Sequence, residues 1–226
     1  MILEPIAPKI LSVRRLHAAH PALLHAYGAD PDRHRSLGLV TCDQDDATYV
    51  ALDEATKHAA VDVVFARSFY AGAAHASGRL SGEVLGVLAG ADPDEVEAGL
   101  RRLIGCLEHD ACFYRADDHG TVTLFPHVIA ALGRYLSHQA GLQPGDSMAY
   151  LVAPPLEATV GMDAALKSAE VRVVKVFTPP TKTNFAAAWL TGDLEACQAA
   201  AAAFAEAVVN VAREPKEPRF SSQPDS

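Results

Sequence analysis

The spacing of apolar and polar residues along the chain predicts alternating strands and amphipathic helices. Apolar residues recur at intervals of three and four over Val96–Leu107, which is typical of a helix that buries one face. The preceding residues predict the start of this helix, with Asp92 as N-cap and Pro93 at the first helical position. The short runs Val61–Ala66 and Val171–Phe177 are rich in β-branched residues and predict strands.

The same pattern occurs twice in the chain. When Asp53–Val64 is set above Asp163–Val174, the residues Asp, Ala, Lys, Ala, Val, Val and Val coincide at one constant offset. Each segment predicts a short helix that begins at an aspartate N-cap and leads into a strand. Self-similarity of this kind indicates an internal duplication.

The duplication continues on both sides of these segments. Glu83–Gly90 and Phe185–Gly192 each predict an apolar strand that ends in glycine, and an acidic helix start follows each; Asp193 begins the second of these helices. Upstream, the first half predicts strand Ile10–Leu16, a helix near Pro21–Tyr27 and strand Ser36–Cys42, and the second half predicts Ala111–Arg115, a helix near Pro126–Gln139 and strand Met148–Val152.

This order of elements predicts an α+β fold made of two successive halves, each a sheet with helices packed on it. The boundary falls near His109–Asp110, so we expect one domain over residues 1–109 and a second over 110–214. Residues 215–226 are polar and interrupted by proline, and we expect them to form a disordered tail.

The charge of the chain limits its partners. A formal net charge of −9 leaves no general excess of basic residues for nucleic acid or for an anionic membrane, and a cationic small molecule fits better. The four cysteines form no CxxC pair, which favours reduced thiols in a cytosolic protein. The N-terminus does not resemble a signal peptide, and no stretch approaches the roughly 20 apolar residues of a membrane span.

Two segments could carry chemistry. The acidic cluster Asp43–Asp46 follows a strand directly, and it could bind a cation, act in acid–base chemistry or form a solvated turn. The long connection Arg67–Gly82 is rich in glycine and alanine, which is typical of a functional loop or of a mobile insertion. Its counterpart Thr178–Asn184 is shorter and contains Pro179-Pro180.

Other chemistries find less support. His17 and His20 precede a proline that disfavours a shared helical face, so we interpret the histidines as surface residues and expect no metal site. The common phosphate-binding, dinucleotide-binding, serine-hydrolase and zinc-protease motifs do not occur. Cys42 and Cys106 lie in apolar segments and are interpreted as inert core thiols.

Several long stretches resemble a known family, the tandem-domain shell proteins of bacterial microcompartments, and most closely those of ethanolamine utilisation. The stretches are Arg35–Leu39, Asp53–Lys57, Arg67–His75, Asp146–Thr159 and Gly161–Ala169. The resemblance implies two permuted shell domains, each an antiparallel-type sheet flanked by helices. It also implies a homotrimer that forms a pseudohexagonal tile, packs against other shell proteins in the cytoplasm and has neither a cofactor nor enzymatic activity.

The resemblance further implies a gated central pore and small pores that bind or conduct metabolites such as ethanolamine. Carried over position by position, the ethanolamine site comprises Asp45, Asp46, Tyr70, Glu83, Phe113 and Thr183. The gating loops, Ser68–Ser77 and Thr178–Asn184, contain Ser68, Phe69, Tyr70, Ala71, Gly72, Ala73, Ala74, His75, Pro179, Pro180, Thr181, Lys182, Thr183 and Asn184.

Two other classes of function stay open at the level of sequence. An enzyme could use Asp45, Asp46 and Glu83, although no nucleophile, cofactor motif or metal set accompanies them. A soluble sensor of duplicated α+β domains could bind a small amine without forming a shell. Only the shell protein predicts flat two-dimensional layers of trimers.

Overall fold

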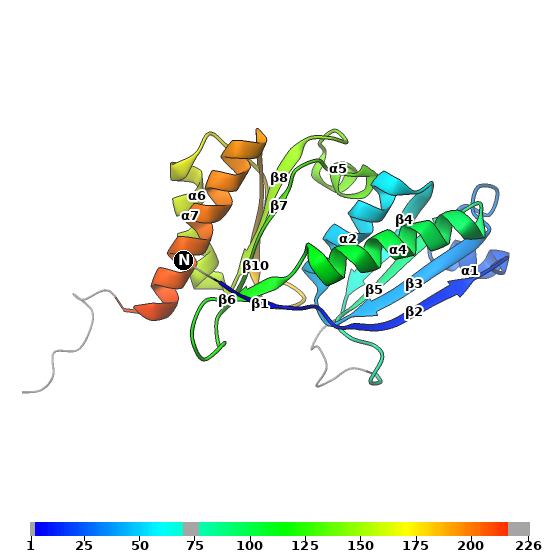
Figure 1. Ribbon diagram of the computed structural model, residues 1–226, viewed down its shortest axis with the longest axis horizontal. Coiled ribbons are helices and arrows are strands. Elements are labelled where there is room, and N and C mark those ends of the chain that lie inside the picture. Colours follow the sequence, from blue (N-terminus) through cyan, green and yellow to red (C-terminus); the bar gives the residue numbers. More distant parts are fainter. Residues whose placement is uncertain (1–2, 70–76, 217–226) are drawn as a thin grey trace, which may run out of the picture.

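The computed structural model describes residues 3–69 and 77–216, and two sheets lie side by side along its long axis (Figure 1). Every strand pair in this part of the chain is antiparallel. Helices pack on both sheets, so the predicted α+β class is confirmed.

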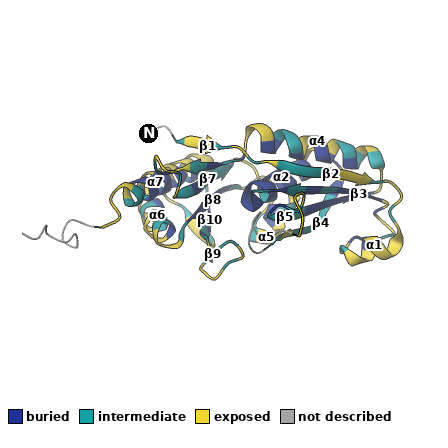
Figure 2. Cartoon of the chain, turned by 90° about the horizontal axis from the view of Figure 1, so that it is seen from below, coloured by how far each residue is buried: buried dark blue, intermediate teal, exposed yellow. Residues whose placement is uncertain are grey.

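The first sheet has four strands in the order β2-β3-β5-β4. They are β2 (Ile10–Leu16), β3 (Ser36–Cys42), β4 (Val61–Ser68) and β5 (Val84–Gly90). Helices α2 (Asp45–His58) and α4 (Pro93–His109) cover one face, and the short helix α1 (Pro21–Ala26) covers part of the other (Figure 2).

The second sheet has six strands in the order β1-β6-β7-β8-β10-β9. They are β1 (Glu4–Ile6), β6 (Phe113–Arg115), β7 (Thr123–Ile129), β8 (Ser147–Ala153), β9 (Arg172–Phe177) and β10 (Ala186–Gly192). Its helices are α5 (Arg134–Ala140), α6 (Pro155–Ser168) and α7 (Leu194–Arg213). The N-terminal strand β1 therefore pairs with the second sheet, through β6.

The duplication is visible in the strand orders. The order β2-β3-β5-β4 of the first sheet matches β7-β8-β10-β9 of the second. Matching helices follow the matching strands: α2 and α6 come after β3 and β8, and α4 and α7 come after β5 and β10. The helix starts agree as well, because Asp92 accepts the backbone N–H of Asp94 at 2.7 Å and Asp193 accepts that of Ala196 at 2.7 Å.

The start of the second half was predicted wrongly. The counterpart of β2 is β7, whereas Ala111–Arg115 contributes β6, for which the first sheet has no equivalent. The helix expected near Pro126–Gln139 begins only at Arg134. Pro126 is accommodated in β7 because the pairing with β6 ends at Leu124. The N–H that proline lacks therefore costs no hydrogen bond to β6.

The aspartates aligned by the repeat do not begin helices, which is a second correction. Asp53 and Asp163 lie in the middle of α2 and α6, because each helix starts two turns earlier than predicted. The Asp53 carboxylate does satisfy a helix start, but that of α5 in the other half: it accepts the N–H groups of Gly133 at 2.7 Å and Leu136 at 2.8 Å.

The two halves share one hydrophobic core. Buried residues of α2 and α4, such as Leu52 and Leu103, belong to the same cluster as Phe125, Tyr150 and Trp189 on one face of the second sheet. A separate cluster lies between the opposite face of that sheet and helices α6 and α7. The second sheet therefore buries both faces, and one of them joins the halves.

Helix α7 changes one expectation about apolar stretches. Its 20 residues are long and apolar enough to cross a membrane by length and composition, contrary to the sequence prediction. In the fold, Cys197, Phe204 and Val208 of this helix are fully buried against the second sheet and α6. The apolar face of α7 is therefore buried within the fold.

Candidate functional site

A cavity of about 310 Å³ lies between the two halves, where α2 and α5 face the second sheet. It is lined by Asp45, Asp46, Tyr49, Ala66, Ser68, Tyr135, Leu136, Gln139, Tyr150, Val152, Lys175, Phe177, Thr181, Lys182, Thr183, Phe185, Ala187 and Trp189. Three of the six predicted ligand residues, Asp45, Asp46 and Thr183, are among them.

Asp45 and Asp46 form the first turn of α2. Strand β3 ends at Cys42, and the chain turns directly into the helix, which brings both carboxylates to the helix N-terminus. Unpaired N–H groups and the helix dipole favour negative charge there. Both residues are buried, at 7% and 8% exposure, so the alternative of a solvated turn is wrong.

Hydroxyl groups hold the two carboxylates in place. Asp45 accepts hydrogen bonds from the Ser68 hydroxyl and, at 2.9 Å, from the backbone N–H of Asp46. Asp46 accepts one from the Tyr150 hydroxyl on β8. Tyr49, one helical turn along α2, contacts Ser68 at 2.7 Å. The carboxylate pair is thus fixed from both halves of the chain.

Burial makes ionisation of this pair costly. It raises the pKa of Asp45 and raises that of Asp46 well above its ordinary value, and the nearby Asp45 charge adds to the second shift. The ordinary aspartate pKa is 3.8, and no arginine or lysine forms an ion pair with either carboxylate among the described residues. A cation in the cavity would offset this cost.

Glu83 lies beside the cavity and does not line it. Its backbone joins two strand ends, since its N–H donates to Cys42 O at 2.8 Å and its carbonyl accepts the N–H of Phe69 at 2.7 Å. Burial raises the pKa of its half-buried carboxyl, and the charges of Asp45 and Asp43 raise it further. The negative charge of Glu83 in turn raises the pKa of Asp46.

Phe113 lies in the hydrophobic core. Its ring packs against Phe125 and Phe185, with centroids 5.1 Å and 5.9 Å apart, and it does not line the cavity. Its backbone N–H donates to Gln44 Oε1 at 3.2 Å, and Gln44 Nε2 donates to Ile6 O at 2.7 Å. Gln44, the residue before α2, thereby ties the carboxylate pair to β1 and β6.

Both predicted loops contribute to the cavity, and Ser68 of the first loop lines it. Thr181, Lys182 and Thr183 line the cavity from the connection between β9 and β10. Ser68 is the last residue of β4, and Phe69 follows it. Tyr70 and Ala71–His75 lie outside the described residues.

Several cavity residues were missed at the level of sequence. Tyr49, Tyr135, Tyr150 and Trp189 supply an aromatic lining, and Lys175 lies on β9. The separation between partners explains the omission: Tyr150 and Asp46 are 104 residues apart in the chain. The chain has one tryptophan, and this rarity is the only sequence signal that pointed to position 189.

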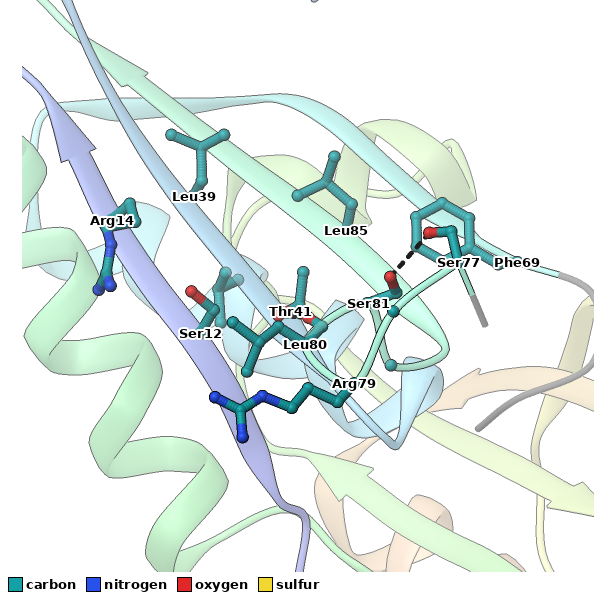
Figure 3. A pocket seen from close by; sticks show the side chains of 13 residues that line it. Ser12, Arg14, Leu39, Thr41, Phe69, Ser77, Arg79, Leu80, Ser81 and Leu85 are labelled. Carbon is teal, nitrogen blue, oxygen red and sulfur yellow. Dashed lines mark hydrogen bonds between the residues drawn. The ribbon is translucent and has the colours of Figure 1, made fainter. Parts of the chain in front are cut away.

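A larger hollow of about 810 Å³ lies on the first sheet (Figure 3). Leu39 and Leu85 form its floor, and Arg14 and the segment Ser77–Gly82 border it. Two described residues of the predicted loops, Phe69 and Ser77, line this hollow. Neither Asp45 nor Asp46 lines it. We therefore place the candidate site in the smaller cavity.

Residues 3–69 and 77–216 contain neither a cluster of metal-binding side chains nor a reactive thiol at Cys42 or Cys106. No group of three or more His, Cys, Asp or Glu side chains is placed there to hold a metal ion. Burial raises the pKa of Cys42 and raises that of Cys106 to about 12, so both thiols are protonated at neutral pH.

Comparison with known proteins defines the class of the chain. The family model of the BMC domain matches residues 36–110, which cover α2, α4 and most of the first sheet. This match assigns the first half of the chain to the class of BMC domains.

Full-length relatives define the family more closely. The chain is 49% identical to the bacterial microcompartment shell protein EutL of Clostridium perfringens over 210 residues, which cover 93% of this chain and 96% of that protein. It is 48% identical to EutL of Salmonella typhimurium over 213 residues, 94% of this chain and 97% of that protein. A crystal structure of Clostridium perfringens EutL superposes with a TM-score of 0.93 and 47% identity, over 97% of this chain and 99% of that one. The chain belongs to the EutL family of bacterial microcompartment shell proteins.

Membership in this family confirms the resemblance found in the sequence. The chain is a structural component of a microcompartment shell and not an enzyme. The alternative of a carboxylate-based enzyme is therefore wrong. The buried aspartates require another explanation than catalysis.

Proposed function

We propose that three copies of this chain form a pseudohexagonal tile of the shell. Each chain contains the same four-strand arrangement twice, so three chains place six similar units around one axis. A closed ring of six units is a shape that can pack edge to edge in a layer with other shell proteins.

Exposed apolar residues on the second half support association. Strand β9 is the edge of the six-stranded sheet and leaves Val173 and Val176 at 41% and 45% exposure. On α6, Leu156 is 62% exposed. Open strand edges and exposed apolar side chains favour pairing with another chain.

The cavity between the halves binds a small protonated amino alcohol such as ethanolamine. The observation that carries this proposal is the buried pair Asp45 and Asp46, fixed by Ser68 and Tyr150 in a cavity with aromatic walls. An ammonium group would form charge-assisted hydrogen bonds to the carboxylates and would restore their ionised form. Thr183 supplies a hydroxyl on the opposite wall.

The affinity for such a ligand is weak. A molecule of about four heavy atoms has a ceiling near 6 kcal/mol, which corresponds to a dissociation constant of tens of micromolar. Weak binding suits a site that senses or passes an abundant metabolite. The loops Ser68–Ser77 and Thr178–Asn184 gate the central pore, and a ligand that prefers the closed tile shifts this gate only by its differential affinity.

Calorimetric titration with ethanolamine tests the site. We expect heat of binding with the wild-type chain, a loss of affinity of about tenfold or more in Asp45→Asn, and a smaller loss in Glu83→Gln, which acts only through its charge. Asp163→Asn is the control, because Asp163 lies on α6, does not line the cavity and has 65% side-chain exposure. Equal affinities in the wild type and in Asp45→Asn would contradict the assignment.

A further inference from the structure

The cavity that contains the carboxylate pair is also lined by two lysines. Lys175 reaches it from β9, and Lys182 reaches it from the loop between β9 and β10. Within residues 3–69 and 77–216, the lysines that form ion pairs are Lys57 and Lys167, both elsewhere. The cavity therefore combines acidic groups on α2 with basic groups on the second sheet and its adjoining loop.

The ammonium of Lys175, an exposed residue of β9, lies over two aromatic rings. Its Nζ lies 4.7 Å from the ring centroid of Phe177 and 5.8 Å from that of Trp189. Both distances are within the range of cation–π attraction. Because the protein's own cation lies over these two rings, a ligand's ammonium is directed to Asp45 and Asp46, and the lysine ammonium is available to an anion.

Trp189, beside Lys175, has a buried donor without a partner among the described residues. Its residue exposure is 6%, and its Nε1 is buried without a hydrogen-bond partner among the described residues. Buried donors are nearly always paired, because an unpaired one loses its hydration without compensation. Trp189 and Lys175 are direct cross-strand partners in β10 and β9, so they project from the same face of the sheet.

The size of the cavity leaves room for more than an amino alcohol. Its 310 Å³ corresponds to about ten water molecules at about 30 Å³ each, and a ligand of four heavy atoms fills a fraction of it. A ligand that spans the cavity can contact the carboxylates at one end and the lysines at the other.

We propose that this cavity binds a small zwitterion, with its ammonium on Asp45 and Asp46 and its anionic group on Lys175 and Lys182. This inference rests on the proposed binding of an ammonium group at the same aspartates. It adds the chemical class of the second group, an anion such as a phosphate or carboxylate.

Competitive and direct calorimetric titrations with ethanolamine, O-phosphoethanolamine and inorganic phosphate test the proposal on the full chain. We expect the wild type to bind O-phosphoethanolamine about fivefold to tenfold more tightly than ethanolamine, since one charged hydrogen bond accounts for such a factor. Lys175→Met should remove most of this preference for O-phosphoethanolamine over ethanolamine. Lys167→Met is the control, because Lys167 is exposed on α6 and pairs with Asp163.

The outcomes separate the two proposals. If the wild type binds ethanolamine but shows no preference for O-phosphoethanolamine, or if Lys175→Met keeps the preference, the zwitterion proposal is overturned and the amine site stands. If inorganic phosphate alone binds as tightly as O-phosphoethanolamine, the site is an anion site and the zwitterion proposal is again overturned. If neither amine binds the wild type, both proposals fail.

Discussion

Three buried aspartates of α2 differ in what surrounds their carboxylates. Asp53 is fully buried and accepts two backbone N–H groups from the start of α5. Asp45 and Asp46 depend instead on hydroxyl groups and share a cavity. The first arrangement joins the two halves of the fold, whereas the second leaves lone pairs for a ligand. One helix thus has an aspartate that joins the two halves and a pair that lines the proposed binding cavity.

Asp53→Ala should destabilise the protein by about 2–4 kcal/mol, because two buried N–H donors lose their acceptor. The repeat provides the matched control, since Asp163 occupies the equivalent position of α6, is exposed and pairs only with Lys167. Asp163→Ala should cost less than about 0.5 kcal/mol. Chemical denaturation of both variants measures the difference, and equal losses would show that the contact between Asp53 and α5 is unimportant.

The raised pKa of Asp46 should appear in the pH dependence of stability. A carboxyl whose pKa lies above its ordinary 3.8 in the folded state binds more protons there than in the unfolded chain. Its contribution therefore lowers stability as the pH rises from 3.8 through the folded-state pKa, opposite to the usual aspartate. Asp46→Asn should remove this decrease and be more stable than the wild type at pH 8.

Denaturation of both proteins between pH 4 and pH 8 provides the measurement. The amide side chain introduced by Asp46→Asn retains an acceptor for the Tyr150 hydroxyl, so loss of that hydrogen bond does not confuse the comparison. Parallel stability curves for the two proteins would mean that Asp46 titrates normally.

Some single residues of the candidate site could be predicted from the sequence, and others could not. Asp45 and Asp46 stand out because carboxylates follow a strand directly, and their role as ligands came from family resemblance. Lys175 and Trp189 carry no local signal, because their significance arises from packing of β9 and β10 against α2, more than 100 residues away in the chain. Contacts between distant segments depend on the tertiary fold, which local periodicity does not encode.

At the scale of elements, small residues set the distance between α6 and α7. A Cβ added at Gly161 would lie 2.6 Å from Cδ2 of Phe204, which is inside van der Waals contact. The two helices therefore approach closely only because position 161 lacks a side chain. The hydrophobic cluster under the second sheet depends on this approach.

Gly161→Ala should destabilise the protein by about 1–3 kcal/mol through overpacking. Gly105 in α4 is the control, since a Cβ there would meet no atom within 4 Å. Gly105→Ala should stabilise the protein by about 0.5–1 kcal/mol because alanine favours a helix. Thermal unfolding distinguishes the two, and a stabilising Gly161→Ala would contradict the packing account.

Most elements could be predicted from the chain, and the exceptions have physical causes. The helix stripe at Val96–Leu107 and the paired strand segments are local patterns, and the structure contains them. The starts of α2 and α6 were misplaced because an internal aspartate was taken for a cap. Strand β1 was missed because its three residues Glu4–Ile6 form a strand only by pairing with β6.

At the scale of the whole molecule, the duplication connects the fold to the shell. Two equivalent four-strand units share a core, and the second unit leaves an apolar strand edge at β9 exposed. A monomer with this edge would expose it to water, whereas a trimer can bury it. The proposed tile therefore explains features that an isolated chain leaves unexplained.

Electron microscopy of the purified chain tests this central claim most directly. We expect particles of threefold symmetry, with about three times the 23.9 kDa mass of one chain, that join into flat layers with hexagonal spacing. Particles of a single 23.9 kDa chain that form no layers at high protein concentration would contradict the assignment of this chain as a shell tile.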